Sequence, residues 1–217
     1  MRTVVSLGPD APQDPEFTRI AHHRADLKIL AAMVERVFGW LAEHPRPPRE
    51  KLPLPHPQGL ELALLANRPD LLASAAPLTL VGFFGQRRSE VAADRRQALW
   101  DIDARLTDEV KDHPGIVSLA CQELDDGNYA NLVLLADQQA LDHWRESVTH
   151  QSAVREHAPA YYESIRIHNG TLDREVLIVN RTKYYAFGPQ PWFSQREFHP
   201  PLTARSSRSK PLLGLEH

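Results

Sequence analysis

Residues 78–84 read LTLVGFF, a short apolar run, and residues 161–170 read YYESIRIHNG, in which apolar and polar side chains alternate. Both runs are typical of β-strands. Between them the sequence indicates a helix over residues 89–112, strands over residues 116–122 and 129–136, and a second helix beginning after Asp137. The order β-α-β-β-α-β is that of the ferredoxin-like unit and predicts an α+β fold.

The two central strands of this unit are joined by Asp125-Asp126-Gly127-Asn128, and Asp-Gly between two apolar runs is a strong hairpin signal. Residues 132–135 read LVLL, which is apolar at four consecutive positions. Such a run is expected for a strand that is covered on both faces. We expect the two helices on one face and a partner sheet on the other.

Residues 1–76 read as a helical N-terminal extension with a proline-rich connector. A long apolar stripe predicts a helix over residues 14–44 that packs on the core, because such a stripe is not stable alone in water. We also expect short helices over residues 59–66 and 69–75. The core domain then covers residues 77–187, with a further strand over residues 175–179. Residues 188–217 read as a proline-rich tail, an arm or disordered, ending in expression-tag residues.

The composition is that of an ordinary globular protein, with 42% hydrophobic and 24% charged residues among 217. A net charge of −3 argues against a nucleic-acid surface. No apolar run is long enough for a membrane span, and no signal-peptide core is present, so a cytoplasmic location is expected. The single Cys121 excludes an intrachain disulfide framework.

The segment from Ala140 to His150, which reads ALDHWRESVTH, and the strand YYESIRI that begins at Tyr161 carry a resemblance to a known group. They resemble the antibiotic-biosynthesis-monooxygenase-like domains of the dimeric α/β barrel superfamily. The resemblance covers residues 78–170 and implies a homodimer in which two four-stranded sheets meet face to face. It also implies an apolar cleft between sheet and helices.

Three functions are compatible with this resemblance. The first is a cofactor-independent monooxygenase-like enzyme acting on a small aromatic or hydrophobic substrate. The second is a non-catalytic binder of a small hydrophobic ligand or haem, and the third is a dimerisation or interaction module. Haem-degrading members pair the tryptophan with a histidine ten residues later, where this sequence has Val154.

The resemblance gives Trp144, His150 and His157 as candidate catalytic residues, with Phe83 and Tyr161 as candidate substrate contacts. A histidine can act as a base near neutral pH, and a tryptophan can wall an aromatic substrate. In the alternative, Trp144 is a core anchor and both histidines lie on the surface.

The spacing of Trp144 and His150 makes a sharper prediction. Two side chains six residues apart on a continuous helix are separated by about 600° around its axis. Subtracting one full turn leaves about 240°, so the two side chains lie on different faces. The pair converges only if the helix bends or breaks between Ser147 and His150.

Arg87, Arg166 and His168 form a further candidate group, able to bind an anion if they converge, although each side chain could equally be solvated. No metal site is expected. His22 and His23 are adjacent and point about 100° apart on a helix, whereas a helical metal pair needs i, i+4 spacing.

Overall fold

A computed structural model describes residues 3–7, 20–54, 61–74, 76–174, 176–187, 193–198 and 202–205. The ferredoxin-like core is confirmed. It consists of strand β4 (Leu78–Arg87), helix α3 (Ala93–Asp112), strands β5 (Ile116–Glu123) and β6 (Tyr129–Leu135), helix α4 (Gln138–Glu146) and strand β7 (Tyr162–Asp173). The strands lie in the order β7-β4-β6-β5, the antiparallel order of this fold.

The sheet extends beyond this core on both sides. On one side β3 (Leu62–Ala66) pairs with β5, and β2 (Leu52–Leu54) forms the edge. On the other side β8 (Val176–Phe187) pairs with β7, β9 (Phe193–Phe198) and β10 (Leu202–Arg205) pair with β8, and β1 (Thr3–Leu7) pairs with β9. The N-terminal and C-terminal segments therefore share one sheet with the core.

The prediction of a helix over residues 59–66 is wrong where the structure describes it, because Leu62–Ala66 is a strand. Its sequence, LALLA, has good helix formers, but the partner strand β5 supplies a ladder of five paired residues. Next to it, helix α2 (Pro69–Leu72) is confirmed in a shorter form. The tail also differs from its prediction, since β9 and β10 join the sheet, while residues 206–217 lie outside the described residues.

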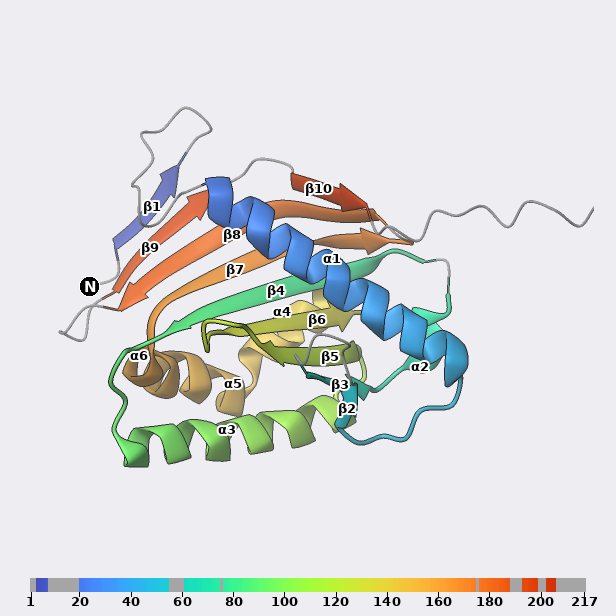
Figure 1. Ribbon diagram of the computed structural model, residues 1–217, viewed down its shortest axis with the longest axis horizontal. Helices are drawn as coiled ribbons and strands as arrows, with labels where there is room; N and C mark the ends of the chain where they lie inside the picture. The colour runs from blue at the N-terminus through green and yellow to red at the C-terminus, as the bar shows by residue number, and fades with distance from the viewer. Residues whose placement is uncertain are drawn as a thin grey trace, which may run out of the picture.

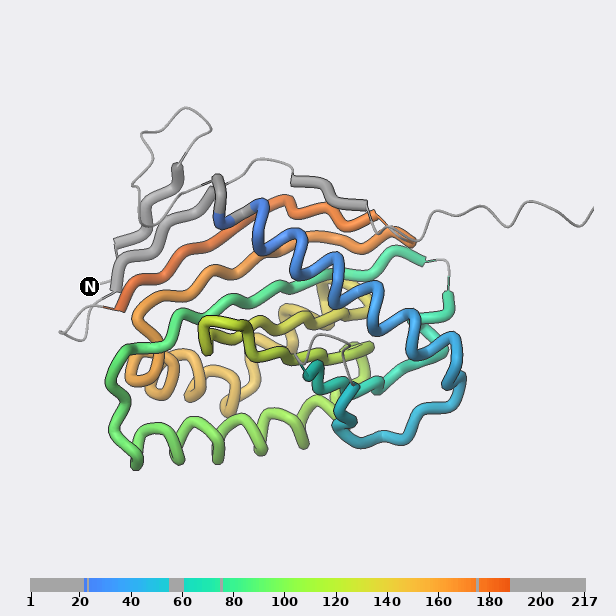
Figure 2. Tube along the Cα trace, in the orientation of Figure 1, coloured from blue at the N-terminus to red at the C-terminus, as the bar shows by residue number. Residues whose placement is uncertain are grey.

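Helix α1 (Ile20–Glu43) lies across one face of the sheet, in front of β4, β6, β7 and β8 (Figures 1 and 2). Its predicted start, over residues 14–19, is outside the described residues. Leu30 of α1 approaches β4 so closely that a side chain at Gly82 would meet it at 2.6 Å, so the glycine permits this packing. The prediction that the N-terminal helix packs on the core is confirmed.

The other face of the sheet carries α3 and the helical segments between β6 and β7, with α4 behind the strands in Figure 1, whereas Leu72 of α2 packs with the residues under α1. Here α4 is followed by α5 (Val148–Ser152), a π-helical turn η1 (Ala153–His157) and α6 (Ala158–Tyr161). The core strands thus lie between α1 and these helices. The apolar run at residues 132–135 is covered on both faces, as predicted, but α1 takes the place of the partner sheet that we expected on the second face.

Candidate active site

The second helix of the core breaks at Ser147. Ser147 has φ −54° and ψ 130°, which ends α4, and its Oγ accepts a hydrogen bond from the backbone N–H of His150 at 3.1 Å. Ser147 is therefore both the C-cap of α4 and the N-cap of α5. The break brings the rings of Trp144 and His150 to 5.3 Å between centroids, as the conditional prediction required. Val148 points outward and is 84% exposed.

Glu109 of α3 holds this break in place. Its carboxylate accepts a hydrogen bond from Ser147 Oγ at 2.5 Å and another, shorter one from Thr149 Oγ1. Hydrogen bonds to an ionised acceptor are roughly twice as strong as neutral ones. A carboxylate 40 residues away in the sequence thus fixes the direction of His150, and the local pattern around residue 147 gave no sign of it.

His150 is neutral at physiological pH. Burial and, to a smaller extent, the neighbouring Arg145 lower the pKa of His150 to about 4, although Glu109 partly opposes them. A neutral imidazole has one nitrogen free to accept a proton or hydrogen bond and one that donates. His150 can therefore accept a proton, although with weak basicity.

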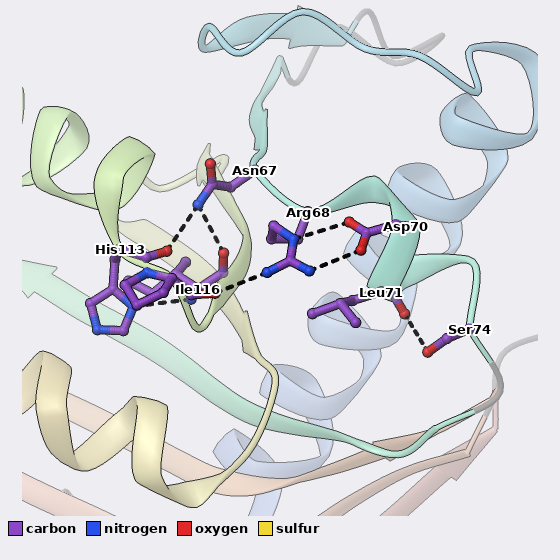
Figure 3. A network of polar contacts seen from close by, with 8 residues as sticks. Asn67, Arg68, Asp70, Leu71, Ser74, His113 and Ile116 are labelled. Carbon is purple, nitrogen blue, oxygen red and sulfur yellow. Dashed lines mark hydrogen bonds and ion pairs between the residues drawn. The ribbon is translucent and has the colours of Figure 1, made fainter.

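His113 supports Trp144 from the end of α3. Asn67, directly after β3, donates from Nδ2 to the carbonyl oxygens of Val110, His113 and Ile116, and Figure 3 shows the last two bonds. His113 Nδ1 accepts from the N–H groups of Gly115 and Ile116, both at 3.1 Å, so its proton is on Nε2. Burial and the nearby His143 lower the pKa of His113, and its ring meets Trp144 edge-on at 5.9 Å.

The sheet surface below these helices is only partly covered. Alternate residues of β4 and β6 face this side, among them Val81, Phe83 and Val133, and all three are half-buried although they lie on central strands. We call this surface the open face. It consists of Val81, Phe83, Leu119, Cys121, Asn131, Val133, Ile167 and Asn169, all of them half-buried.

Phe83 and Tyr161 lie in an aromatic cluster on the same side of the sheet. The ring of Phe83 meets that of Tyr162 at 5.4 Å, and the buried Tyr161 contacts Tyr162 at 4.9 Å and the exposed Trp100 at 6.1 Å. Burial, with Tyr161 next in effect, raises the pKa of Tyr129 to about 12. The cluster is a wall of uncharged aromatic side chains at pH 7.

The remaining candidates do not join Trp144 and His150. His157 is half-buried in η1, and no described ring contact connects it to either residue. Arg87 is exposed at the end of β4, where its backbone N–H donates to Asn128 Oδ1. Val154 is 42% exposed and has no donor atom, so the residues present do not fit a haem ligand there.

Arg166 and His168 lie on the opposite face of the sheet, under α1, and they converge on a carboxylate of this chain. Asp26 Oδ2 accepts from Arg166 Nε at 2.6 Å and lies 2.8 Å from His168 Nε2, while Oδ1 accepts from Arg166 Nη2 at 2.8 Å. His168 Nδ1 lies 2.8 Å from Thr182 Oγ1. The anion that these side chains bind is therefore internal.

The Asp26–His168–Thr182 chain is structural. His168 is 0% exposed and Thr182 is 1% exposed, so a substrate cannot reach the hydroxyl. Burial by itself raises the pKa of Asp26, but the bonds from His168 and Arg166 outweigh it and leave the pKa below its usual value. The sequence signal for this network is Asp26, a charged residue four positions before Leu30 on the otherwise apolar stripe of α1, and our sequence analysis missed it.

Among the described residues no group of three or more His, Cys, Asp or Glu side chains could hold a metal ion. None of the described helices is long and apolar enough to cross a membrane.

No family model matches the chain, and no curated protein matches it. It is similar to the solved structure of protein SO0527 from Shewanella oneidensis, with 14% identity and a TM-score of 0.39, over 46% of this chain and 93% of that one. It is also similar to PA3566 from Pseudomonas aeruginosa, with 13% identity and a TM-score of 0.37, over 47% of this chain and 98% of that one. A third similar structure is that of SnoaB, a cofactor-independent oxygenase from Streptomyces nogalater, with 17% identity and a TM-score of 0.33, over 45% of this chain and 92% of that one. These likenesses concern the fold, which the strand order β7-β4-β6-β5 establishes independently. The core has the α+β fold of the ferredoxin-like unit.

Proposed function

We propose that the chain binds a small aromatic compound between the open face and helices α3 to α6, and that it is a cofactor-independent monooxygenase-like enzyme. The observation that carries this proposal is the alternation of burial along β4, β6 and β7. In the middle of these strands the residues toward α1 are mostly buried, while those toward the other helices are half-buried and mostly apolar; Leu135 and Ile165, nearer the strand ends on the helix side, are buried. A concave, mostly apolar site with a few polar groups is typical of small-molecule binding.

His150 is the proposed base in this reaction. It is neutral, it lies against the Trp144 ring, and it can accept the proton of a ring hydroxyl while Trp144 packs on the ring. For a quinol such as para-dihydroxynaphthalene, one oxygen atom of O₂ enters a ring carbon as a hydroxyl group and the other leaves as water. The product is the hydroxynaphthoquinone, and the quinol has supplied the two electrons and two protons that form the water.

The test separates this reaction from simple oxidation. Uncatalysed oxidation of para-dihydroxynaphthalene gives naphthoquinone and hydrogen peroxide, without oxygen insertion. We expect the protein to give hydroxynaphthoquinone with one atom of labelled oxygen from ¹⁸O₂. The rate should fall by about 10²-fold or more in His150→Ala, and His157→Ala is the control. Unlabelled product, or equal rates for His150→Ala and the unsubstituted protein, would exclude His150 as the base.

Binding without turnover is a second candidate, and the low basicity of His150 favours it. A group with a pKa of about 4 is far from the value near pH 7 at which a general base works best. In this case an aromatic probe would bind with an affinity that depends on Trp144, while no oxygen would be consumed.

The homodimer implied by the resemblance stays a prediction for this chain. Helix α1 covers the sheet face that the resemblance assigns to a partner sheet. We therefore propose that a dimer, if one forms, uses another surface and leaves α1 in place. Sedimentation combined with hydrogen exchange on α1 tests this, and loss of α1 protection on dimerisation would contradict it.

A further inference from the structure

Asn169 lies at one corner of the open face, on β7, the outermost of its four strands. On β7 it follows His168, which faces α1, so its own side chain faces the other helices. It pairs with Val81 of β4 on one side and with Arg181 of β8 on the other. Its amide therefore has the apolar side chain of Val81 beside it on β4, at the edge of the proposed binding surface.

The orientation of this amide is fixed by Arg145. Asn169 Oδ1 accepts a hydrogen bond from Arg145 Nη2 at 3.0 Å. Arginine only donates, so the atom facing it must be the amide oxygen. The Nδ2 group therefore points elsewhere, and it is buried with no hydrogen-bond partner among the described residues.

The backbone next to Asn169 is irregular in a way that directs its side chain. Asn169 pairs with Arg181 and Gly170 pairs with Val179, so Asn180 is an extra residue in β8 and forms a bulge. At Gly170 a side chain would meet the carbonyl oxygen of Ile178 at 1.9 Å, so the two strands can approach this closely only with glycine there. Bulges are common beside active sites, where they re-aim a side chain.

Arg145 also connects Asn169 to the proposed base. The same guanidinium that holds the Asn169 oxygen is close enough to lower the pKa of His150. Its side chain is partly exposed and also pairs with Asp142 at 3.3 Å. His150, Arg145 and Asn169 therefore surround one region beside Trp144, with a proton acceptor and an unpartnered N–H donor.

We propose that Asn169 Nδ2 donates a hydrogen bond to a carbonyl or phenolate oxygen of the bound ring, which defines the ligand as an aromatic or fused-ring compound bearing such an oxygen. This inference rests on the proposed function of the open face. A buried donor without a partner is unfavourable, and an oxygen acceptor on the ligand removes that cost. When His150 takes a proton from the ring hydroxyl, the same donor stabilises the charge left on the oxygen. Arg145 acts as a positioning residue, through the amide.

The experiment compares two ligands of nearly equal shape, tetralone and tetralin, which differ by one carbonyl oxygen. Affinities are measured by calorimetry with the full chain, as unsubstituted protein and as Asn169→Leu. We expect Asn169→Leu to weaken tetralone binding by roughly tenfold and to change tetralin binding by less than about twofold. Asn169→Ala should show the same loss of preference, which guards against a steric effect of leucine.

Two further variants sharpen the result. Gln139→Leu, which removes an exposed amide of α4 outside the open face, should leave the tetralone-to-tetralin ratio unchanged. Arg145→Met should lower the ratio by about threefold, because the amide is then free to rotate. Arg145→Lys keeps a hydrogen-bond donor at this position, so it should retain part of the preference for tetralone over tetralin.

The outcomes separate the two proposals. If both ligands bind and Asn169→Leu weakens them equally, the Asn169 inference is wrong while the binding surface stands. If neither ligand binds to the unsubstituted protein, the proposed function fails, and the role of Asn169 fails with it.

Discussion

The two faces of the central sheet are built from alternate residues of the same strands, yet they differ in how completely they are covered. Leu80, Leu132 and Leu134 face α1 and are 0% exposed, whereas their neighbours Val81 and Val133 are half-buried under the other helices. Helix α1, with 24 residues, covers its face of the sheet, whereas the shorter helices α3 to α6 leave the opposite face partly uncovered. The comparison suggests that the α1 face stabilises the fold and the open face carries function.

The polar groups follow the same division. Under α1 the buried Asp26 and His168 and the half-buried Arg166 bind one another, although Ser118 Oγ on that face has no partner among the described residues. On the other side His150 has a strongly lowered pKa and Asn169 has an unpartnered N–H group. Perturbed pKa values and unsatisfied donors mark functional sites, whereas a closed network marks a structural one.

Removal of residues 1–44 should have the largest effect, because it exposes the whole apolar face under α1. We expect a molten core that keeps its far-ultraviolet circular dichroism, loses its near-ultraviolet signal and binds a hydrophobic dye. A truncated protein with a sharp, dispersed NMR spectrum would show that α1 is dispensable, and the comparison of faces would then fail.

Asp26→Ala should cost about 3–5 kcal/mol of unfolding free energy, because Arg166 and His168 are left without their acceptor. Glu43→Ala, at the exposed end of the same helix, is the control and should stay within about 0.5 kcal/mol. Urea unfolding at pH 7 measures both.

Lowering the pH should reduce the free energy of unfolding through the same Asp26 carboxylate. Since the pKa of Asp26 is lowered in the folded state, its stabilisation is fully present above pH 3.8 and is lost as the pH falls below that value. Asp26→Ala should lack this part of the acid transition.

Leu134→Ala and Val133→Ala compare the two faces at adjacent positions of β6. Leu134 is fully buried under α1, so we expect a loss of about 2–5 kcal/mol. Val133 is half-buried on the open face, and about 1 kcal/mol or less is expected there. Equal losses in urea unfolding would mean that both faces are equally packed.

A further pH dependence of stability is expected from protonation of His150. Between pH 6.5 and about 4 the unfolded chain binds a proton at His150 that the folded chain does not. Stability should therefore fall over this window as the pH falls, by no more than about 3 kcal/mol. His150→Gln should flatten the profile between pH 6.5 and 4.5. A histidine NMR titration with a midpoint near 6.5 would contradict the burial of this ring.

The sequence was informative where the signals are local. The alternating strands, the Asp126-Gly127 turn and the Asp137 cap, which accepts from the N–H of Ala140, were all predicted. The geometric condition on Trp144 and His150 located where a break would have to lie, and the structure places one at Ser147. Each of these depends on residues within one or two turns of each other.

The sequence was uninformative where distant segments decide the structure. Asp26 and Arg166 are 140 residues apart, and Glu109 acts on Thr149 across 40 residues. Strand β3 forms because β5 is beside it, against the helix preference of its own residues. No local pattern shows which buried donor has lost its partner, so Asn169 emerges only from the structure.

Helix α1 also determines how the sheet responds to dilution. A sheet face covered by a second molecule is protected only at concentrations above the dissociation constant of the pair. A helix in the same chain acts at an effective concentration set by its tether and independent of the amount of protein. The apolar face under α1 therefore stays covered in a single isolated molecule.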